Sequence, residues 1–453
     1  MKIRFIVVLI TSAGLVCVSQ GEQKKAADES SKFGIVESLE IAEVPSDFRV
    51  GFSLLTSGET QYVAYYDKDR RMTVASRSLD SEKWNYQVLP SKVGWDSHNY
   101  VTMAVDGAGH LHVSGNMHVV PLIYFRTGKA GDISTLKQFP MTRQDEGRVT
   151  YPKFVHDAEG RLVFHYRDGG SGKGREIYNV YDTKTRTWSR LLDQPLVDGE
   201  GKMNAYMNGP VMGPDGWFHM HWVWRDSPDC ATNHHLSYAR TKDLIHWESA
   251  FGEKVGLPIT LDQKELWVDP IPNGGGIING GHKLFIDSQE NPVIFYHKSD
   301  AAGHMQIYAA RPEDGKWRSG VLTDWEKPVP FSGRGSIGFV GIRISDASRV
   351  NEDTLILNYS HKDYGSGYLL VDEKTLERSR KQGSVRPDYP LEIRQVQSDF
   401  PGMQVQRSED IGVSPDDDVR YLIRWESLGS NRDRPRQPPL PEPDTLELYK
   451  LRE

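Results

Sequence analysis

A turn rich in Asp, Gly, Asn and Pro recurs along this chain, each time between two segments that alternate apolar and polar residues. Most copies continue into a third such segment and an aromatic-capped fourth, as in EIYNVYDTKTRTWSR and QIYAARPEDGKWRSGVL. Four short strands per copy are typical of one propeller blade, because radial repetition leaves few sheet edges exposed. The segments after the turn begin near Tyr62, Leu111, Leu162, Phe218, Val293, Leu355 and Tyr421. These seven copies predict an all-β fold, a seven-bladed β-propeller with four-stranded antiparallel blades.

The two ends of the repeat region are predicted to meet in one blade. The stretch GIVESLEIAEV, residues 34–44, and the terminal LELYKL, residues 446–451, could pair as strands and close the ring. Residues 34–453 would then form a single propeller domain, with the Pro-rich run from Arg434 to Pro443 as a loop. A β-sandwich with repeated hairpins is the alternative.

The N-terminal residues have the pattern of an export signal. Lys2 and Arg4 precede an apolar run from Phe5 to Val18, which is short for a membrane span. We expect residues 1–20 to be a cleaved signal peptide and the mature protein to be secreted or periplasmic. A lipid anchor on Cys17 is the alternative, and no later segment is long and apolar enough to cross a bilayer.

The charge balance restricts the partners. Asp and Glu number 62 against 55 Lys and Arg, a net charge of −7. A negative field disfavours nucleic acid and anionic membranes, which require phosphate-neutralising patches. An acidic ligand would therefore need a locally basic site, and we expect the protein to act as a monomer.

Polar residues recur at one rim of the predicted ring. The start of each innermost strand and the end of the next strand lie at the same rim, where side chains from several blades can converge on one ligand. Taken singly, His98 could be a turn histidine, Tyr151 a packing residue and Arg167 half of a surface ion pair. The residues at this rim are His98, Asn99, His118, Tyr151, Arg167, Asn208, Arg225, His282 and Lys298.

The segment WDSHNYVTMAVDGAGHLHVSGNMHVVPLIYFR resembles the BNR-repeat propellers that include the ulvan lyases, which are exported polysaccharide lyases. The resemblance spans most of the chain and is strongest between Trp95 and Ala239. His98 and His118 match a histidine pair of that family, and Tyr151 with Arg167 matches its Tyr–Arg pair around the uronate. The resemblance implies catalytic roles for these four, and the rim predicts substrate contacts for Asn99, Asn208, Arg225 and His282.

The chemistry of elimination accounts for these residue types independently. Removing a carbon-bound proton beside a carboxylate requires that the carboxylate charge be neutralised, which suits Arg167. The base must have a pKa near the working pH, which suits a histidine, or a tyrosine beside a cation. We therefore expect His118 or Tyr151 as the base, and His98 as the group that protonates the leaving oxygen or holds the carboxylate.

A second cluster lies in HMHWVWRDSPDCATNHH. The chain has two cysteines, so Cys230 remains alone after processing at residue 20 and needs burial or a metal to protect its thiol. His221, Cys230 and His234 are the types of ligand that a structural zinc uses, with His219, His235 or His165 as the fourth. Some ulvan lyases are similar in carrying such a zinc. A buried free cysteine beside ordinary histidines is the alternative.

The leading hypothesis is a secreted polysaccharide lyase that cleaves an acidic, uronate-containing polysaccharide with rhamnose–glucuronate linkages by β-elimination, without a redox cofactor. A propeller glycoside hydrolase is one alternative; it would need two carboxylates, for which Asp96 and Asp168 are the candidates. A non-catalytic glycan-binding propeller is the other, with Trp95, Trp222, Trp224 and Trp267 as sugar platforms.

Overall fold

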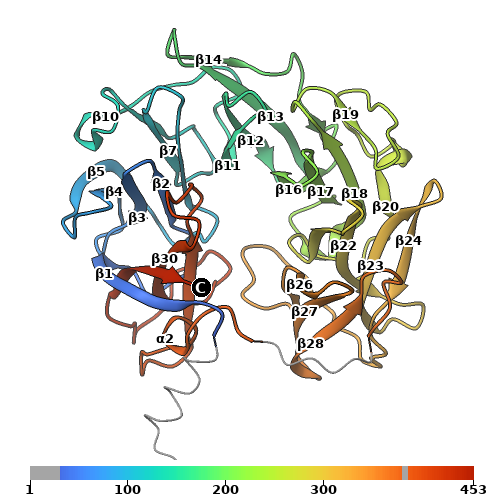
Figure 1. Cartoon of the computed structure of the whole chain (residues 1–453). Helices are drawn as coiled ribbons and strands as arrows, with labels where there is room; N and C mark the ends of the chain where they lie inside the picture. Colours follow the sequence, from blue (N-terminus) through green and yellow to red (C-terminus); the bar gives the residue numbers. More distant parts are fainter. Residues whose placement is uncertain (1–30, 380–385) are drawn as a thin grey trace, which may run out of the picture.

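The computed structural model describes residues 31–379 and 386–453, and within them seven antiparallel sheets succeed one another along the chain. The sheets are arranged in a ring (Figure 1). The predicted signal peptide lies outside the described residues. Within those residues, no helix is long and apolar enough to cross a membrane.

The first four sheets run from Ser53 to Asp269 and are linked by short loops. The first comprises β2 (Ser53–Ser57), β3 (Thr60–Tyr66), β4 (Arg71–Ser78) and β5 (Asn85–Lys92). The second comprises β6 (Val101–Val105), β7 (Leu111–Gly115), β9 (Tyr124–Thr127) and β10 (Leu136–Gln138). The third comprises β8 (His118–Val120), β11 (Val149–His156), β12 (Leu162–Gly170), β13 (Lys173–Asp182), β14 (Thr187–Arg190) and β15 (Val197–Asp198). The fourth comprises β16 (Asn204–Met212), β17 (Phe218–Arg225), β18 (Asn233–Thr241), β19 (Trp247–Glu248) and β20 (Trp267–Asp269).

The remaining three sheets complete the described chain. The fifth comprises β21 (His282–Ile286), β22 (Pro292–Ser299), β23 (Met305–Glu313) and β24 (Lys316–Val321). The sixth comprises β25 (Ile342–Ile344), β26 (Ser348–Asn351), β27 (Thr354–His361) and β28 (Gly365–Asp372). The seventh comprises β1 (Gly34–Val44), β29 (Met403–Glu409), β30 (Val419–Leu428) and β31 (Asp444–Arg452). The helical turns are η1 (Ile133–Thr135), η2 (Cys230–Thr232), η3 (Lys264–Leu266) and α2 (Leu391–Arg394).

The repeat read from the sequence corresponds to the second strand of each sheet. The strands β3, β7, β12, β17, β22, β27 and β30 begin at the expected residue or at most two residues before it. These strands are flanked on both sides within their sheet, and β17 is buried along its whole length. The all-β, antiparallel prediction is confirmed.

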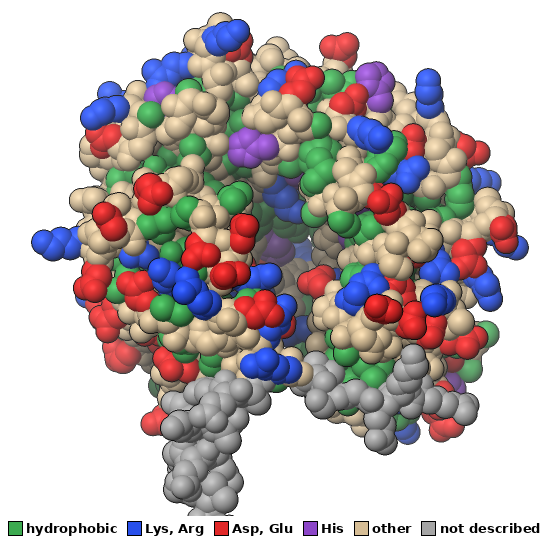
Figure 2. Space-filling model, in the orientation of Figure 1, with side chains coloured by type: hydrophobic (Ala, Val, Ile, Leu, Met, Phe, Trp, Pro, Cys, Tyr) green, Lys and Arg blue, Asp and Glu red, His purple; other side chains and the backbone are tan. Residues whose placement is uncertain are grey.

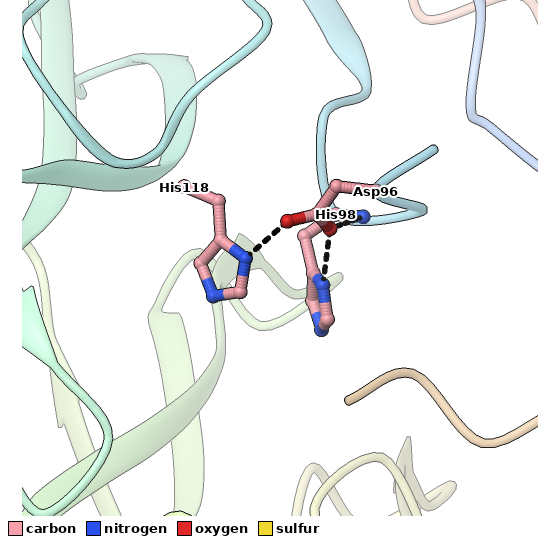
Figure 3. Close-up of side chains that lie close together, drawn as sticks. All are labelled: Asp96, His98 and His118. Atoms are coloured by element: carbon pink, nitrogen blue, oxygen red, sulfur yellow. Dashed lines mark hydrogen bonds and ion pairs between the residues drawn. The ribbon is translucent and has the colours of Figure 1, made fainter. Parts of the chain in front are cut away.

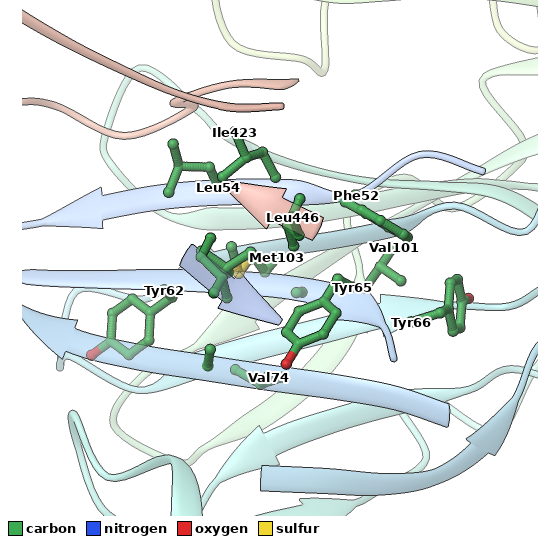
Figure 4. Close-up of a cluster of buried hydrophobic side chains, with 14 of the residues drawn as sticks. Phe52, Leu54, Tyr62, Tyr65, Tyr66, Val74, Val101, Met103, Ile423 and Leu446 are labelled. Atoms are coloured by element: carbon green, nitrogen blue, oxygen red, sulfur yellow. The ribbon is translucent and has the colours of Figure 1, made fainter. Parts of the chain in front are cut away.

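The two ends of the chain pair in one sheet. β1 and β31 run antiparallel, with Leu39 opposite Leu448 and Val44 opposite Asp444. The pairing expected for residues 34–44 and 446–451 is therefore confirmed. Figure 4 shows Ile423 and Leu446 packed in one apolar cluster with side chains such as Phe52 and Val101 from the first two sheets. Burial of each such side chain stabilises the closed ring by about 1.5–3 kcal/mol.

The sixth sheet departs from the four-strand pattern. Both β25 and β26 pair with the same side of the hairpin strand β27, as two short pieces of one inner strand, and β28 pairs with its other side. Beyond β28, an isolated bridge joins Val371 to Arg378. The long loop of residues 322–341 leads into this sheet.

Candidate active site

Asp96 lies between two histidine rings at one end of the ring of sheets. His98 Nδ1 is 2.7 Å from one oxygen of Asp96, and His118 Nδ1 is 2.5 Å from the other (Figure 3). The two imidazole rings are 4.4 Å apart. With Nδ1–H donating to Asp96, the Nε2 atom of each ring carries the lone pair in the neutral form.

Local backbone geometry places both histidines. The main-chain N–H of His98 also donates to Asp96 Oδ1 at 2.9 Å, which is an Asx-type turn. His118 is carried by β8, which leaves the second sheet and pairs with β11 of the third, so that His118 lies opposite Thr150. Residues 98 and 118 are thus brought beside Tyr151, whose ring is 5.9 Å from that of His98.

Asp433, on the loop between β30 and β31, is a second carboxylate partner of His98. Its Oδ2 is 3.5 Å from His98 Nδ1, and its two oxygens accept from the main-chain N–H groups of Ser97 and Ser336. Burial lowers the pKa of His98, but its hydrogen bonds to the carboxylates of Asp433 and Asp96 outweigh this effect and raise that pKa to about 9. His98 is therefore an imidazolium at neutral pH.

We expect the substitution Asp433→Asn to lower the pKa of His98 below 9. The amide keeps one oxygen acceptor, for either the Ser97 or the Ser336 N–H group, but removes the charge that favours the imidazolium. The pKa is measured by NMR titration of the histidine ring protons, with Asp416→Asn, an exposed carboxylate bonded to Arg452, as the control. An unchanged His98 pKa would show that Asp96 alone sets it.

Tyr151 and Arg167 face each other across a β-bulge. The register of β11 against β12 shifts between Thr150 and Lys153, and Tyr151 has a φ of +57°, which is rare for a bulky residue. Pro152 follows directly and lacks an N–H, so a regular ladder cannot continue there. The bulge directs the Tyr151 ring to 4.8 Å from the Arg167 guanidinium carbon.

Among the described residues, Arg167 is a buried cation that forms no ion pair, although the buried Glu176 lies opposite it in the register of β12 against β13 and interacts with it electrostatically. The arginine side chain is fully buried, its Nε donates to the carbonyl of Gly169 at 3.1 Å, and neither terminal nitrogen has a hydrogen-bond partner. A Cβ at Gly174 would lie 2.9 Å from Arg167 Cδ, so glycine makes room for this side chain. Because leaving buried donors of a charged group without hydrogen bonds is costly, the two free nitrogens point to an anionic ligand.

Tyr206 and Arg225 complete the group, and the sequence did not single out Tyr206. The Tyr206 ring is 5.6 Å from the Arg167 guanidinium carbon and 5.2 Å from that of Arg225. Its hydroxyl shares a 2.6 Å hydrogen bond with Ser171. Tyr206 lies inside an ordinary inner strand, so no motif marks it.

The two tyrosines differ in acidity. Burial and the neighbouring Tyr206 raise the pKa of Tyr151 above 10, although two arginines oppose this. Burial also acts to raise the pKa of Tyr206, but the charges of Arg167 and Arg225 outweigh it and the pKa falls below 10. The arginines do act to lower the Tyr151 pKa, as the sequence led us to expect, but burial outweighs them there, and the pKa that ends below its usual value is that of Tyr206.

Two of the predicted substrate contacts, Asn208 and His282, lie elsewhere than expected. Asn208 was expected beside Arg225, but Asn204 pairs with Arg225 and Asn208 pairs with His221. His282 is fully buried, with its Nδ1 2.7 Å from that of His221. The expected and observed pairings differ by small shifts of strand register, and the sequence of a single strand does not show its register against its neighbour. Asn99 follows His98 and is half-buried, and Lys298 forms an ion pair with Asp269 at 2.6 Å.

The residues named for zinc do not form one ligand set. His221 lies on the same side of the fourth sheet as Arg225 and its partner Asn233, so the adjacent His234 points to the other side. His234 Nε2 is instead 2.8 Å from Asp226. In the ranges that the structure describes, the one group of three ligand atoms within 4.8 Å of one another belongs to Asp96, His98 and His118, and Cys230 is absent from it. We therefore derive no step through zinc.

The ring of antiparallel sheets defines a propeller-type fold, and the family is shown directly. The model of the family described as "BNR repeat-containing family member" matches residues 60–325, and the chain belongs to this family. Among curated proteins, an ulvan lyase, long isoform, of Glaciecola sp. (strain KUL10) is 36% identical over 68 residues, 15% of this chain. The ulvan lyase, short isoform, of Alteromonas sp. (strain LOR) is 33% identical over 64 residues, 14% of this chain. The matches span 6% and 12% of those relatives' lengths.

Two solved structures share the fold over nearly the whole chain. The polysaccharide lyase Uly1 has a TM-score of 0.61 and 14% identity, covering 92% of this chain and 99% of its own. A PL25 ulvan lyase bound to -[GlcA(1-4)Rha3S]- has a TM-score of 0.57 and 13% identity, covering 90% of this chain and 95% of its own. At this identity the likeness establishes the fold.

Proposed function

We propose that this protein is a seven-bladed propeller lyase that cleaves a polysaccharide with rhamnose–glucuronate linkages by β-elimination. The observation that carries the proposal is the buried Arg167 guanidinium, with two unpaired nitrogens, beside Tyr151, Tyr206 and the Asp96–His98–His118 group. The BNR family, the ulvan lyase relatives and the two lyase structures support the same reaction class.

In this mechanism Arg167 holds the uronate carboxylate. Its paired N–H donors match a carboxylate, and the surrounding burial strengthens their effect as charge builds on that group. A base then takes the proton from the carbon beside the carboxylate, the electron pair forms the new carbon–carbon double bond, and the bond to the glycosidic oxygen breaks. The leaving oxygen takes up a proton.

His118 is assigned as the base. Its Nδ1–H is held by Asp96, which leaves Nε2 as the acceptor, and about a quarter of its side chain is exposed (27%). His98, kept charged by Asp96 and Asp433, lies within the same group and can donate a proton. Tyr151, with its raised pKa, is the neutral phenol that protonates the leaving oxygen, and Tyr206 helps Arg167 orient the carboxylate.

Hydrolysis by a carboxylate pair has less support. Asp96 is bonded to two histidines, and Asp168 is in an ion pair with Arg175 at 3.0 Å. The Trp222 and Trp224 side chains, offered as platforms in a glycan-binding protein, are almost fully buried. Elimination needs neither a carboxylate pair nor an exposed tryptophan, and uses Arg167, Tyr151 and the two histidines instead.

The protein incubated with ulvan should produce material that absorbs in the ultraviolet, because elimination leaves a 4,5-unsaturated uronate at each new non-reducing end. The measurement follows this absorbance together with reducing ends. New reducing ends without absorbance would indicate hydrolysis instead, and polymer binding with neither signal would indicate a glycan-binding protein.

A further inference from the structure

The loop of residues 322–341 is linked to the candidate site through Asp433, and we call it the mouth loop. It is tied to the fourth sheet, since Gly333 N–H donates to Asp229 at 2.7 Å and Cys230 N–H donates to Gly333 O at 2.9 Å. It is tied to the seventh sheet as well, since Ser336 N–H donates to Asp433 at 2.9 Å. Asp433 also contacts His98, so the mouth loop and the catalytic group share a residue.

A groove runs along the mouth loop. Its central part is a cavity of about 420 Å³ lined by Pro330, Phe331, Ser332, Ile337, Phe339, Val340 and Arg432, which we call the mouth groove. At one end it shares Pro330 and Phe331 with a larger cavity of about 660 Å³ that reaches Lys298. Because Arg432 precedes Asp433, the groove begins one residue away from the partner of His98. The space-filling view shows the hollow at the centre of the ring, with basic and histidine side chains visible in it (Figure 2).

Two arginines bring positive charge to the groove: Arg432 lines it, and Arg343 lines an adjoining cavity that shares Ile337, Phe339 and Val340 with it. Arg432 donates to the carbonyls of Ser332 and Arg334, and Arg343 donates to that of Gly338 at 2.6 Å. Within the described part of the chain, neither guanidinium forms an ion pair; Asp229, whose carboxylate accepts from the main-chain N–H groups of Ala231 and Gly333, interacts with Arg432 only at longer range. Carbonyl contacts hold these side chains in place without cancelling their charge, although the protein as a whole is acidic, with a net charge of −7. Charge of this kind is suited to an anionic ligand.

An aromatic ring lies beside these cations. Phe339 is 46% exposed, and the Arg343 guanidinium carbon is 5.8 Å from its ring centre. An exposed apolar ring can stack on the hydrogen-bearing face of a sugar, while the neighbouring arginine binds an acidic substituent. Phe339 and Arg343 are thus a matched pair for an acidic sugar.

We propose that the mouth groove is a second subsite, which binds another acidic sugar of the same polymer through Arg432 and Phe339 of the groove and through Arg343, which lines the adjoining cavity. This inference rests on the proposed function. The shared ligand chemistry is a carboxylate or a sulfate ester, and the polymer would extend from the reacting uronate at Arg167 past Asp433 into the groove.

The test uses the whole protein with Arg432→Gln and Arg343→Gln, and ulvan as the probe. Arg318→Gln is the control, because Arg318 is exposed on the outer strand β24 and pairs with Glu313 at 3.1 Å. We expect each groove variant to weaken ulvan binding by about tenfold in Kd, as loss of one charge-assisted hydrogen bond does. KM for ulvan should rise in parallel, with kcat on a short unsulfated oligosaccharide unchanged. Desulfated and carboxyl-reduced ulvan then identify which anion the groove binds.

Unchanged ulvan affinity in folded groove variants would overturn the subsite. So would an equal loss on the polymer and the short oligosaccharide, because the arginines would then act at the reacting sugar. Absence of unsaturated product from the unmodified protein would instead refute the proposed function. The affinity measurement needs no turnover, so it still decides the subsite in that case.

Discussion

The substitution Arg167→Met should slow unsaturated product formation from ulvan by about 10³-fold, because the carboxylate charge that grows in the transition state loses its donors. The same variant should have an unchanged or higher melting temperature. Methionine has a similar volume and no charge, whereas the arginine is fully buried with two unpaired nitrogens. Activity and stability are thus expected to move in opposite directions.

Rates come from the ultraviolet assay and melting temperatures from calorimetry. Arg318→Met, on an exposed outer strand, is the matched control and should change neither. A folded Arg167→Met protein that keeps more than about a tenth of the rate would remove Arg167 from the mechanism. A large fall in melting temperature would show that the guanidinium stabilises the fold, and that its nitrogens are satisfied in the native protein.

The second strand of each sheet could be predicted from the sequence because the pattern that marks it depends on local burial. Each second strand is covered on both sides, so it requires apolar residues between two turns, and Leu111, Leu162 and Phe218 mark strand starts to the residue. The convergence of His98, His118, Tyr151 and Arg167 followed from propeller geometry, in which equivalent strand ends share a rim. The pairing of β1 with β31 could be predicted because the first and last segments of the repeat region each have the pattern of a strand without a neighbour in sequence.

The remainder of the site depends on contacts that strand patterns do not contain. Asp433 contacts His98 from a Pro-rich loop and is 335 residues away from it in sequence. Alternation of apolar and polar residues predicts strands, but it does not predict where a loop places its side chains. The pKa of Tyr206 falls below its usual value, against the effect of burial, because two arginines from different sheets lie beside it. The side of the sheet that His234 faces could not be predicted from alternation either. It is set by a β-bulge at the level of Val223 and Trp224, which turns His234 away from His221.

Acid should destabilise the protein through histidines buried near the candidate site. His165 is 4% exposed, its Nδ1 has no partner, and it is stacked 4.8 Å from Tyr178. Burial, with the charge of Lys153, lowers the pKa of His165 to about 3. The unfolded chain binds the proton near pH 6.5, so this stability is present above that pH and is lost as the pH falls toward 3. At pH 4 the loss is about 3 kcal/mol.

Replacing His165 by phenylalanine should remove this dependence. Phenylalanine keeps the stacking on Tyr178 and takes up no proton, so the free energy of unfolding of His165→Phe, relative to the unmodified protein, should rise by about 3 kcal/mol between pH 7 and pH 4. Chemical denaturation at several pH values measures it. Glu176 supplies a control of opposite sign, because burial raises its pKa to about 7 and its ionisation in the unfolded chain costs stability above pH 4.5. Glu176→Gln should therefore become more stable, relative to the unmodified protein, as the pH rises toward neutral. If the unmodified protein and His165→Phe instead had parallel pH profiles of stability, His165 would already be charged in the folded protein.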